Sequence, residues 1–179
     1  MSKIILDQSQ EIEMAKNIGM QMMIAAETAP KGKGRNTIQM CLLQHEEQIK
    51  LCSEMIRIAE DTGPKFFNRD AQNIQNSLAI LVIGSEISPL NLPNCGFCGF
   101  EGCSEKELQM NAPCCFNSID LGIAIGSAVS TALMHKVDTR VMYSAGKAAV
   151  SLNLLGENVK IAFGIPISIS SKNIFFDRT

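Results

Sequence analysis

The sequence predicts an α+β fold in which helices pack on a small mixed sheet. Residues 8–29 and 45–61 carry apolar side chains three and four positions apart, as helices with one buried stripe do. Residues 78–83 are instead a continuous apolar run, which is typical of a strand buried on both faces. The chain has 179 residues, of which 46% are hydrophobic and 19% charged, so it is globular and long enough for one core. We therefore expect a single domain over residues 1–179.

The other elements follow from local signals along the chain. Pro30 stops the first helix, and Gly63-Pro64 ends the second. Further helices are expected at residues 66–76, at 118–135, and from Ser144 to Gly156; further strands are expected at 37–43, 139–143 and 159–165.

Charge and termini narrow the functional classes. The net charge is −2 and the basic residues are scattered apart from Lys31 to Arg35, so neither nucleic acid nor a membrane surface is expected as a partner. The first residues turn polar too soon for a signal peptide, and no apolar run reaches membrane-spanning length. We expect a cytoplasmic protein, in which seven cysteines do not form a disulfide framework.

The most specific feature is an inserted cysteine-rich loop at residues 87–116, where all periodicity stops. Its cysteines are spaced Cys95-x2-Cys98-x4-Cys103-x10-Cys114, and Cys115 is adjacent to the last. Four thiolates are the usual ligands of a [4Fe–4S] cluster, and neighbouring glycines allow backbone amides to point toward it.

Other readings of this loop stay open. Zinc also accepts four thiolates, although zinc modules more often contain two short cysteine pairs. Unmetallated or redox-active thiols are the third alternative. The remaining two cysteines, Cys41 in a strand and Cys52 on the apolar face of a helix, are expected to be small buried hydrophobes.

Several motifs resemble known families. The run C-G-F-C-G resembles the iron–sulfur module of corrinoid and electron-transport subunits. Residues 25–38, which include A-P-K-G-K-G-R-N, and the stretch from Asp120-Leu-Gly-Ile-Ala to Gly164-Ile-Pro166 resemble the FMN-dependent nitroreductases. Together with the cysteine loop, these segments resemble a family of uncharacterised prokaryotic ferredoxin-domain proteins. In that family the last cysteine precedes a small residue and a phenylalanine, which makes Cys114 the fourth ligand and gives Cys115 the small-residue place.

The resemblance implies a nitroreductase-like fold, a homodimer joined through residues 118–135, and FMN as a second cofactor. The arginine-rich segment that grips the flavin phosphate in nitroreductases is missing before residue 25. Lys172 and Arg178 in the tail are further candidates for that task, and a solvated loop is the alternative for residues 31–36. The candidate flavin contacts are Lys31, Lys33, Arg35 and Asn36 for the phosphate, and Gly146 and Lys147 near the ring.

Two functions from different classes are consistent with these features. The first is a redox or electron-transfer protein that binds a [4Fe–4S] cluster through Cys95, Cys98, Cys103 and Cys114, with or without FMN. Its electron donor would be a protein or a small molecule. The second is a non-catalytic structural protein stabilised by zinc or by a cluster.

Overall fold

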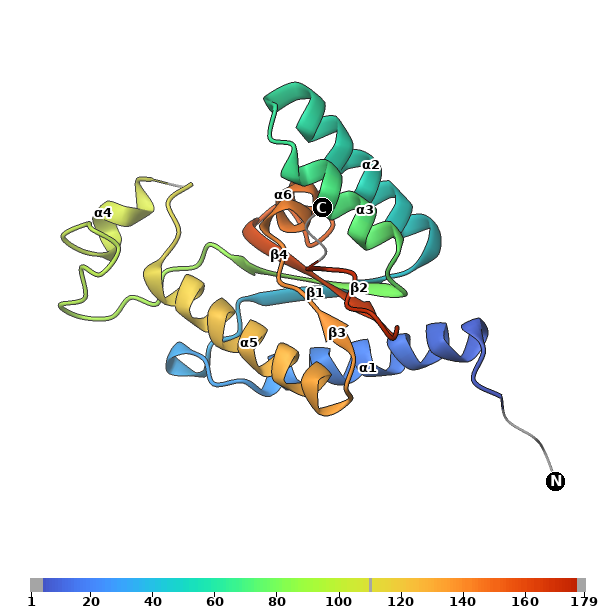
Figure 1. Cartoon of the computed structure of the whole chain (residues 1–179). Coiled ribbons are helices and arrows are strands. Elements are labelled where there is room, and N and C mark those ends of the chain that lie inside the picture. Colours follow the sequence, from blue (N-terminus) through green and yellow to red (C-terminus); the bar gives the residue numbers. More distant parts are fainter. Residues whose placement is uncertain (1–4, 110, 177–179) are drawn as a thin grey trace.

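A computed structural model describes residues 5–109 and 111–176. A four-stranded sheet lies between two helical layers, with α1 and α5 on one face and α2, α3 and α6 on the other (Figure 1). The elements are α1 (Gln8–Thr28), η1 (Gly32–Gly34), β1 (Ile38–Leu43), α2 (His45–Thr62), α3 (Phe66–Gln75), β2 (Ala79–Glu86), α4 (Cys103–Glu107), α5 (Cys115–Met134), β3 (Asp138–Thr139), α6 (Tyr143–Ser151) and β4 (Val159–Ser168).

The sheet has the order β1-β2-β4-β3, and each described strand pair is antiparallel. The continuous apolar run became β2, which is central and has Val82 between Cys41 of β1 and Gly164 of β4. Every residue of β2 is buried except the last. The expected α+β class, with helices packed on a small sheet, is confirmed, but the described strand pairs make this sheet antiparallel rather than mixed.

Two hydrophobic clusters fill the spaces above and below the sheet. Successive strand side chains point to opposite faces, so Leu81 and Ile83 contact the cluster of α1 and α5. Ile80 and Val82 instead contact the cluster of α2, α3 and α6. Both faces of β2 are therefore core, which explains why its sequence does not alternate.

Three expectations about local structure need correction. The strand expected at 139–143 is only two residues long, because Tyr143 already begins α6. The helix expected from Ser144 to Gly156 begins at Tyr143 and ends at Ser151. The buried hydroxyl of Ser144 donates to Asp70 Oδ2 at 2.6 Å, which ties α6 to α3. The short helix α4 was not expected, because five residues are too few to show a helical period.

One helix among the described residues, α5, is long and apolar enough to cross a membrane, which corrects the expectation that no run has that length. Length and composition are the only basis of this comparison, and a core helix of a soluble protein meets the same criterion. In the structure α5 lies beside α1 and packs on the sheet (Figure 1).

Candidate metal centre

The chain between β2 and α5 leaves the sheet and forms a separate lobe that includes α4 (Figure 1). Cys95 and Cys98 lie in irregular turns of this lobe, and Cys103 is the first residue of α4. Cys114 is the N-cap residue of α5, and Cys115 is the first residue of that helix. All of these cysteines are free thiols, so the lobe is a loop supplied with sulfur ligands.

Glycine is required in the turn that carries the first two cysteines. Gly96 and Gly99 have φ values of 61° and 87°, in the left-handed region that residues with a Cβ rarely adopt. The amide of Gly99 donates to the carbonyl of Gly96 at 3.0 Å and closes the turn between them. Cys98 therefore lies inside a tight turn whose backbone conformation depends on its glycine neighbours.

An aromatic pair brings this turn next to the start of α5. The rings of Phe97 and Phe116 stack with their centroids 6.0 Å apart and their planes 15° apart. Phe97 lies between Cys95 and Cys98 in the sequence, whereas Phe116 follows Cys115. The stack thus places the turn of Cys95 and Cys98 beside the start of α5, where Cys114 lies, although both cysteines are distant from Cys114 in the sequence.

The thiols share one lobe without forming a complete ligand sphere. Across residues 5–109 and 111–176, no three side chains of the types His, Cys, Asp or Glu are grouped so that they could hold a metal ion. The donor set nevertheless fits a thiolate-ligated metal, because soft sulfur ligands select iron–sulfur clusters or zinc. Metal sites of this kind commonly take shape only as the metal binds. The assignment of Cys95, Cys98, Cys103 and Cys114 as ligands stays a prediction.

The start of the lobe is fastened to α5 by a residue that the sequence did not single out. Asn117 is 1% exposed, and its Oδ1 accepts from the amide of Ser88 at 2.9 Å. Its Nδ2 donates to the carbonyl of the same serine at 3.0 Å. One side chain therefore satisfies both backbone groups of Ser88, and it sits three positions after Cys114. An asparagine just before the helix expected at residues 118–135 was the available signal in the sequence.

The cationic segment proposed for the flavin phosphate has other partners. Lys31 Nζ donates to the carbonyls of Ala26, Glu27 and Ala29 at 3.0, 2.6 and 2.9 Å, which satisfies the open carbonyls at the end of α1. Asn36 Nδ2 donates to Glu27 Oε1 at 2.8 Å. These contacts make the two residues part of the C-terminal cap of α1.

The other donors of residues 31–36 contact the start of the lobe and α5. Lys33 Nζ donates to the carbonyl of Leu90 at 3.3 Å, and Arg35 Nη1 donates to that of Pro89 at 3.1 Å. The amide of Gly32 donates to both oxygens of buried Asp120, at 3.0 and 3.1 Å. Residues 31–36 thus connect the start of the lobe to α5, and in this arrangement their donors do not fit a phosphate cradle.

The second part of the predicted flavin site lies in the other helical layer. A Cβ on Gly146 would lie 1.7 Å from the carbonyl oxygen of Ala162, so this glycine is needed for close packing of α6 on β4. Lys147 is exposed, and both residues line a cavity of about 150 Å³ beside β4. Residues 31–36 contact α5 instead, so one chain does not bring the two parts together. Arg178 lies outside the described residues.

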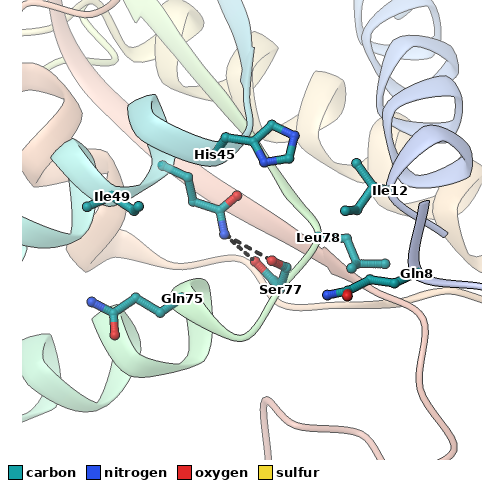
Figure 2. A pocket seen from close by; sticks show the side chains of 8 residues that line it. Gln8, Ile12, His45, Ile49, Gln75, Ser77 and Leu78 are labelled. Carbon is teal, nitrogen blue, oxygen red and sulfur yellow. Dashed lines mark hydrogen bonds between the residues drawn. The ribbon is translucent and has the colours of Figure 1, made fainter. Parts of the chain in front are cut away.

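A larger cavity, of about 470 Å³, lies away from the cysteine lobe, where the first turn of α1 meets the start of α2 (Figure 2). His45 and Ile12 project toward it from these two helices. Gln48 is buried there, and its Nε2 donates to the carbonyl of Ser77 at 3.0 Å. No cysteine lines this cavity, and its buried amide is already hydrogen-bonded.

Comparison with known proteins identifies the family. Residues 111–178 match the family described as "Uncharacterized protein containing a ferredoxin domain (DUF2148)", and this region includes Cys114 and Cys115. An uncharacterized protein from Archaeoglobus fulgidus is 40% identical over 173 residues, covering 93% of this chain and 92% of its own length. The chain belongs to this ferredoxin-domain family.

The fold is nitroreductase-like. The structure of an oxidoreductase containing FMN matches with a TM-score of 0.61 and 14% identity, covering 96% of this chain and 80% of its own. An FMN-dependent nitroreductase from Clostridium difficile matches with a TM-score of 0.54 and 13% identity, with the same shares. A nitroreductase family protein from Clostridium novyi has a TM-score of 0.55 and 14% identity, covering 97% of this chain and 81% of its own. At these identities the likeness establishes the fold of the ferredoxin-domain protein.

Proposed function

We propose that this ferredoxin-domain protein is an iron–sulfur redox protein that carries a [4Fe–4S] cluster on Cys95, Cys98, Cys103 and Cys114. The observation that carries the proposal is the cysteine lobe: four thiols at cluster-type spacing in a loop whose start is fastened to α5. When bound, such a cluster supplies one-electron transfer.

The residues around the thiols favour an anionic centre. Cys114 lies at the N-terminus of the 20-residue helix α5, where the helix dipole and free amides stabilise negative charge. The positive-φ conformations of Gly96 and Gly99 allow amides of the turn to face a sulfur ligand. These features favour an anionic metal centre in the lobe.

The geometry favours Cys114 over Cys115 as the fourth ligand. Cys114 is 5% exposed and precedes the helix, so its backbone is not committed to a helical turn. Cys115 lies within the first turn of α5 and is half-buried. This makes Cys115 the matched control for ligand replacement.

The test is anaerobic purification and reconstitution with iron and sulfide, followed by metal analysis of the wild type and of five cysteine-to-serine variants. We expect about four iron and four sulfide per chain, with broad absorption at about 400 nm. Serine at Cys95, Cys98, Cys103 or Cys114 should each lower iron retention, whereas Cys115→Ser should retain the cluster. Full iron retention in the Cys114→Ser variant together with loss in Cys115→Ser would reverse the assignment of the fourth ligand.

Zinc is the alternative outcome of the same experiment. A colourless protein that contains one zinc per chain and takes up no iron would identify a structural thiolate site, since zinc is redox-inert and tetrahedral. The protein would then belong to the second class, a metal-stabilised structural protein. A preparation that binds neither metal would refute both.

FMN binding is a separate hypothesis, and its support is the nitroreductase-like fold. The donors of Lys31, Lys33 and Arg35 would first have to leave the carbonyls that they now contact. Titration with FMN under reducing conditions tests this: saturable binding that Lys31→Ala, Lys33→Ala and Arg35→Ala abolish together would support the phosphate assignment. Absence of binding by the wild type would leave the cluster as the sole cofactor of the proposal.

A homodimer through residues 118–135 is part of the proposal. The outer face of α1 and α5 exposes large apolar side chains, namely Met14, Met20 and Ile24 on α1 and Ile119, Ile123, Leu133 and Met134 on α5. A Cβ on Gly122 or Gly126 would meet no atom of the chain within 4 Å, so α5 is smooth there and open to a second helix. We further propose that the dimer is cytoplasmic and takes electrons from a protein or small-molecule donor.

A further inference from the structure

The cavity between the first turn of α1 and the start of α2 has the size of a ligand site (Figure 2). Its volume of about 470 Å³ lies within the range of small-molecule pockets, which is about 300–1,000 Å³. It is found at the end of α1 that is distant from the cysteine lobe (Figure 1). Neither the metal centre nor the flavin hypothesis gives this cavity a role.

Two glutamine side chains hold the walls of the cavity together. Gln44 Nε2 donates to the carbonyls of Ile12 and Leu78, at 3.2 Å each, and so joins α1 to the start of β2. Gln48 Nε2 donates to the carbonyl of Ser77 at 3.0 Å, which joins α2 to the segment that follows α3. The shape of the cavity is therefore set by the folded chain itself.

The second glutamine leaves one acceptor facing the cavity. Gln48 is 5% exposed and lines the cavity. Because a carbonyl oxygen only accepts hydrogen bonds, the bond to Ser77 places the amide nitrogen there and directs Oε1 elsewhere. No group of residues 5–109 and 111–176 donates to this Oε1. In the same residues, Asn73 Nδ2 is the only enclosed side-chain polar atom without a partner, so Gln48 Oε1 is reached from the cavity.

A histidine in an unfavourable backbone conformation lies beside this acceptor. His45 begins α2 with a φ of 52°, which residues with a Cβ rarely adopt. Its ring projects toward the cavity (Figure 2). Strained residues of this kind are concentrated at sites that contact ligands. The conformation of His45 therefore agrees with a role in binding, which the accessible amide oxygen indicates independently.

The lining indicates a neutral and flat ligand. Among the described residues that line the cavity there is no Asp, Glu, Lys or Arg, so an ion would lose its hydration without gaining a countercharge. Ile49 lies on one side and Ile12 and Leu78 lie on the other, which suits the two apolar faces of a ring (Figure 2). Gln48 Oε1 needs a donor from the ligand, and the exposed amide of Gln75 can donate and accept.

We propose that this cavity binds a neutral nitrogen heterocycle of the nucleobase type. A ring N–H or amino group of the ligand donates to Gln48 Oε1, as glutamine amides do toward base edges, and His45 contacts the ring. The site needs no metal, so it is independent of the proposed function of the cysteine lobe.

Binding of uracil and adenine to the purified protein tests the ligand class. Both bases are neutral and carry N–H donors, and equilibrium dialysis should show saturable binding of at least one, with a dissociation constant of about 1 mM or lower. Fully N-methylated derivatives keep the rings without N–H groups, so they should bind about tenfold more weakly. Orotate, which is uracil with a carboxylate, should not bind, because the cavity offers no countercharge.

Two variants test the contacts. Gln48→Met keeps the length of the side chain without its acceptor, so the affinity for the base should fall about tenfold. His45→Gly removes the ring and suits the positive φ, so it should weaken binding about threefold or more while its melting temperature stays at or above that of the wild type. Asn153→Gly is the matched control, because Asn153 also has a positive φ, of 53°, and does not line the cavity.

Three results would each overturn the proposal. The first is the absence of saturable binding of both bases. The second is binding of the methylated derivatives as tightly as the parent bases. The third is wild-type affinity in His45→Gly, which carries the test alone if Gln48→Met does not fold. Metal-free and metal-loaded protein should give the same affinity, so failure of the cluster proposal would leave this one standing.

Discussion

Replacing Asn117 tests whether the base of the cysteine lobe is held by side-chain hydrogen bonds to Ser88. The Asn117→Leu variant keeps a side chain of similar size but removes both bonds, which measure 2.9 and 3.0 Å. The Asn117→Asp variant keeps the acceptor for the amide of Ser88 and places a second acceptor against the serine carbonyl. Ser118→Ala, at an exposed position of the same helical turn, is the control.

The expected magnitude follows from the burial of the partners. A buried polar group that loses its partner costs about 1–3 kcal/mol. Asn117 is 1% exposed but Ser88 is only half-buried, so water can satisfy part of the serine backbone. We therefore expect Asn117→Leu to lower the free energy of unfolding by about 2–3 kcal/mol, at the lower end for two such groups. In a chain of this size, that corresponds to a fall in melting temperature of about 4–12 °C.

The assay is urea unfolding of the metal-free protein, followed by metal retention under a chelator. Asn117→Asp should be at least as destabilising as Asn117→Leu, because it buries a carboxylate that faces a carbonyl oxygen. Both variants should also lose metal faster than Ser118→Ala. If both variants unfold within about 0.5 kcal/mol of the wild type, a margin typical of surface substitutions, the two hydrogen bonds do not hold the lobe.

Three further predictions concern the rest of the fold. Gly146→Ala should destabilise the protein by about 3 kcal/mol or more in urea unfolding, because its Cβ would lie 1.7 Å from the backbone oxygen of Ala162; wild-type stability would contradict this close packing. Burial raises the pKa of Cys41 and of Cys52 to about 11 from an ordinary value of 9.0, so both thiols favour folding while protonated. Their contribution should be complete below about pH 9 and decrease as the pH rises toward 11. Cys52 is buried as expected, whereas Cys41 is only half-buried, so native protein at pH 8 should resist alkylation at Cys52, and fast labelling of Cys52 would refute its burial. Ile123→Glu on the exposed face of α5 should convert the proposed dimer to a monomer in sedimentation analysis, whereas a wild type that is monomeric at micromolar concentration would exclude the dimer.

Local sequence was enough to predict the main elements. The helical periods of residues 8–29 and 45–61 correspond to α1 and α2, because the spacing of apolar residues depends only on the helix itself. The apolar run at 78–83 predicted the central strand for the same reason. The cysteine spacing also marked the lobe, since the ligands of such centres are concentrated in one short segment. Short elements such as α4 and β3 were missed or misjudged because they contain too few residues to display a period.

The roles of individual polar side chains were decided by the tertiary structure. The sequence indicated a cationic loop at residues 31–36. In the structure, Gly32 forms a hydrogen bond with Asp120, which is 88 positions away, and Lys33 forms one with Leu90. Gly146 was a candidate contact near the flavin ring, yet its lack of a side chain serves the packing of α6 on β4. Likewise, Lys106 is one charged residue among several in the sequence, and only the folded lobe buries it. The physical reason is that secondary structure follows from neighbours along the chain, whereas the partner of a hydrogen bond or a charge is whatever group the packing of distant segments brings within reach.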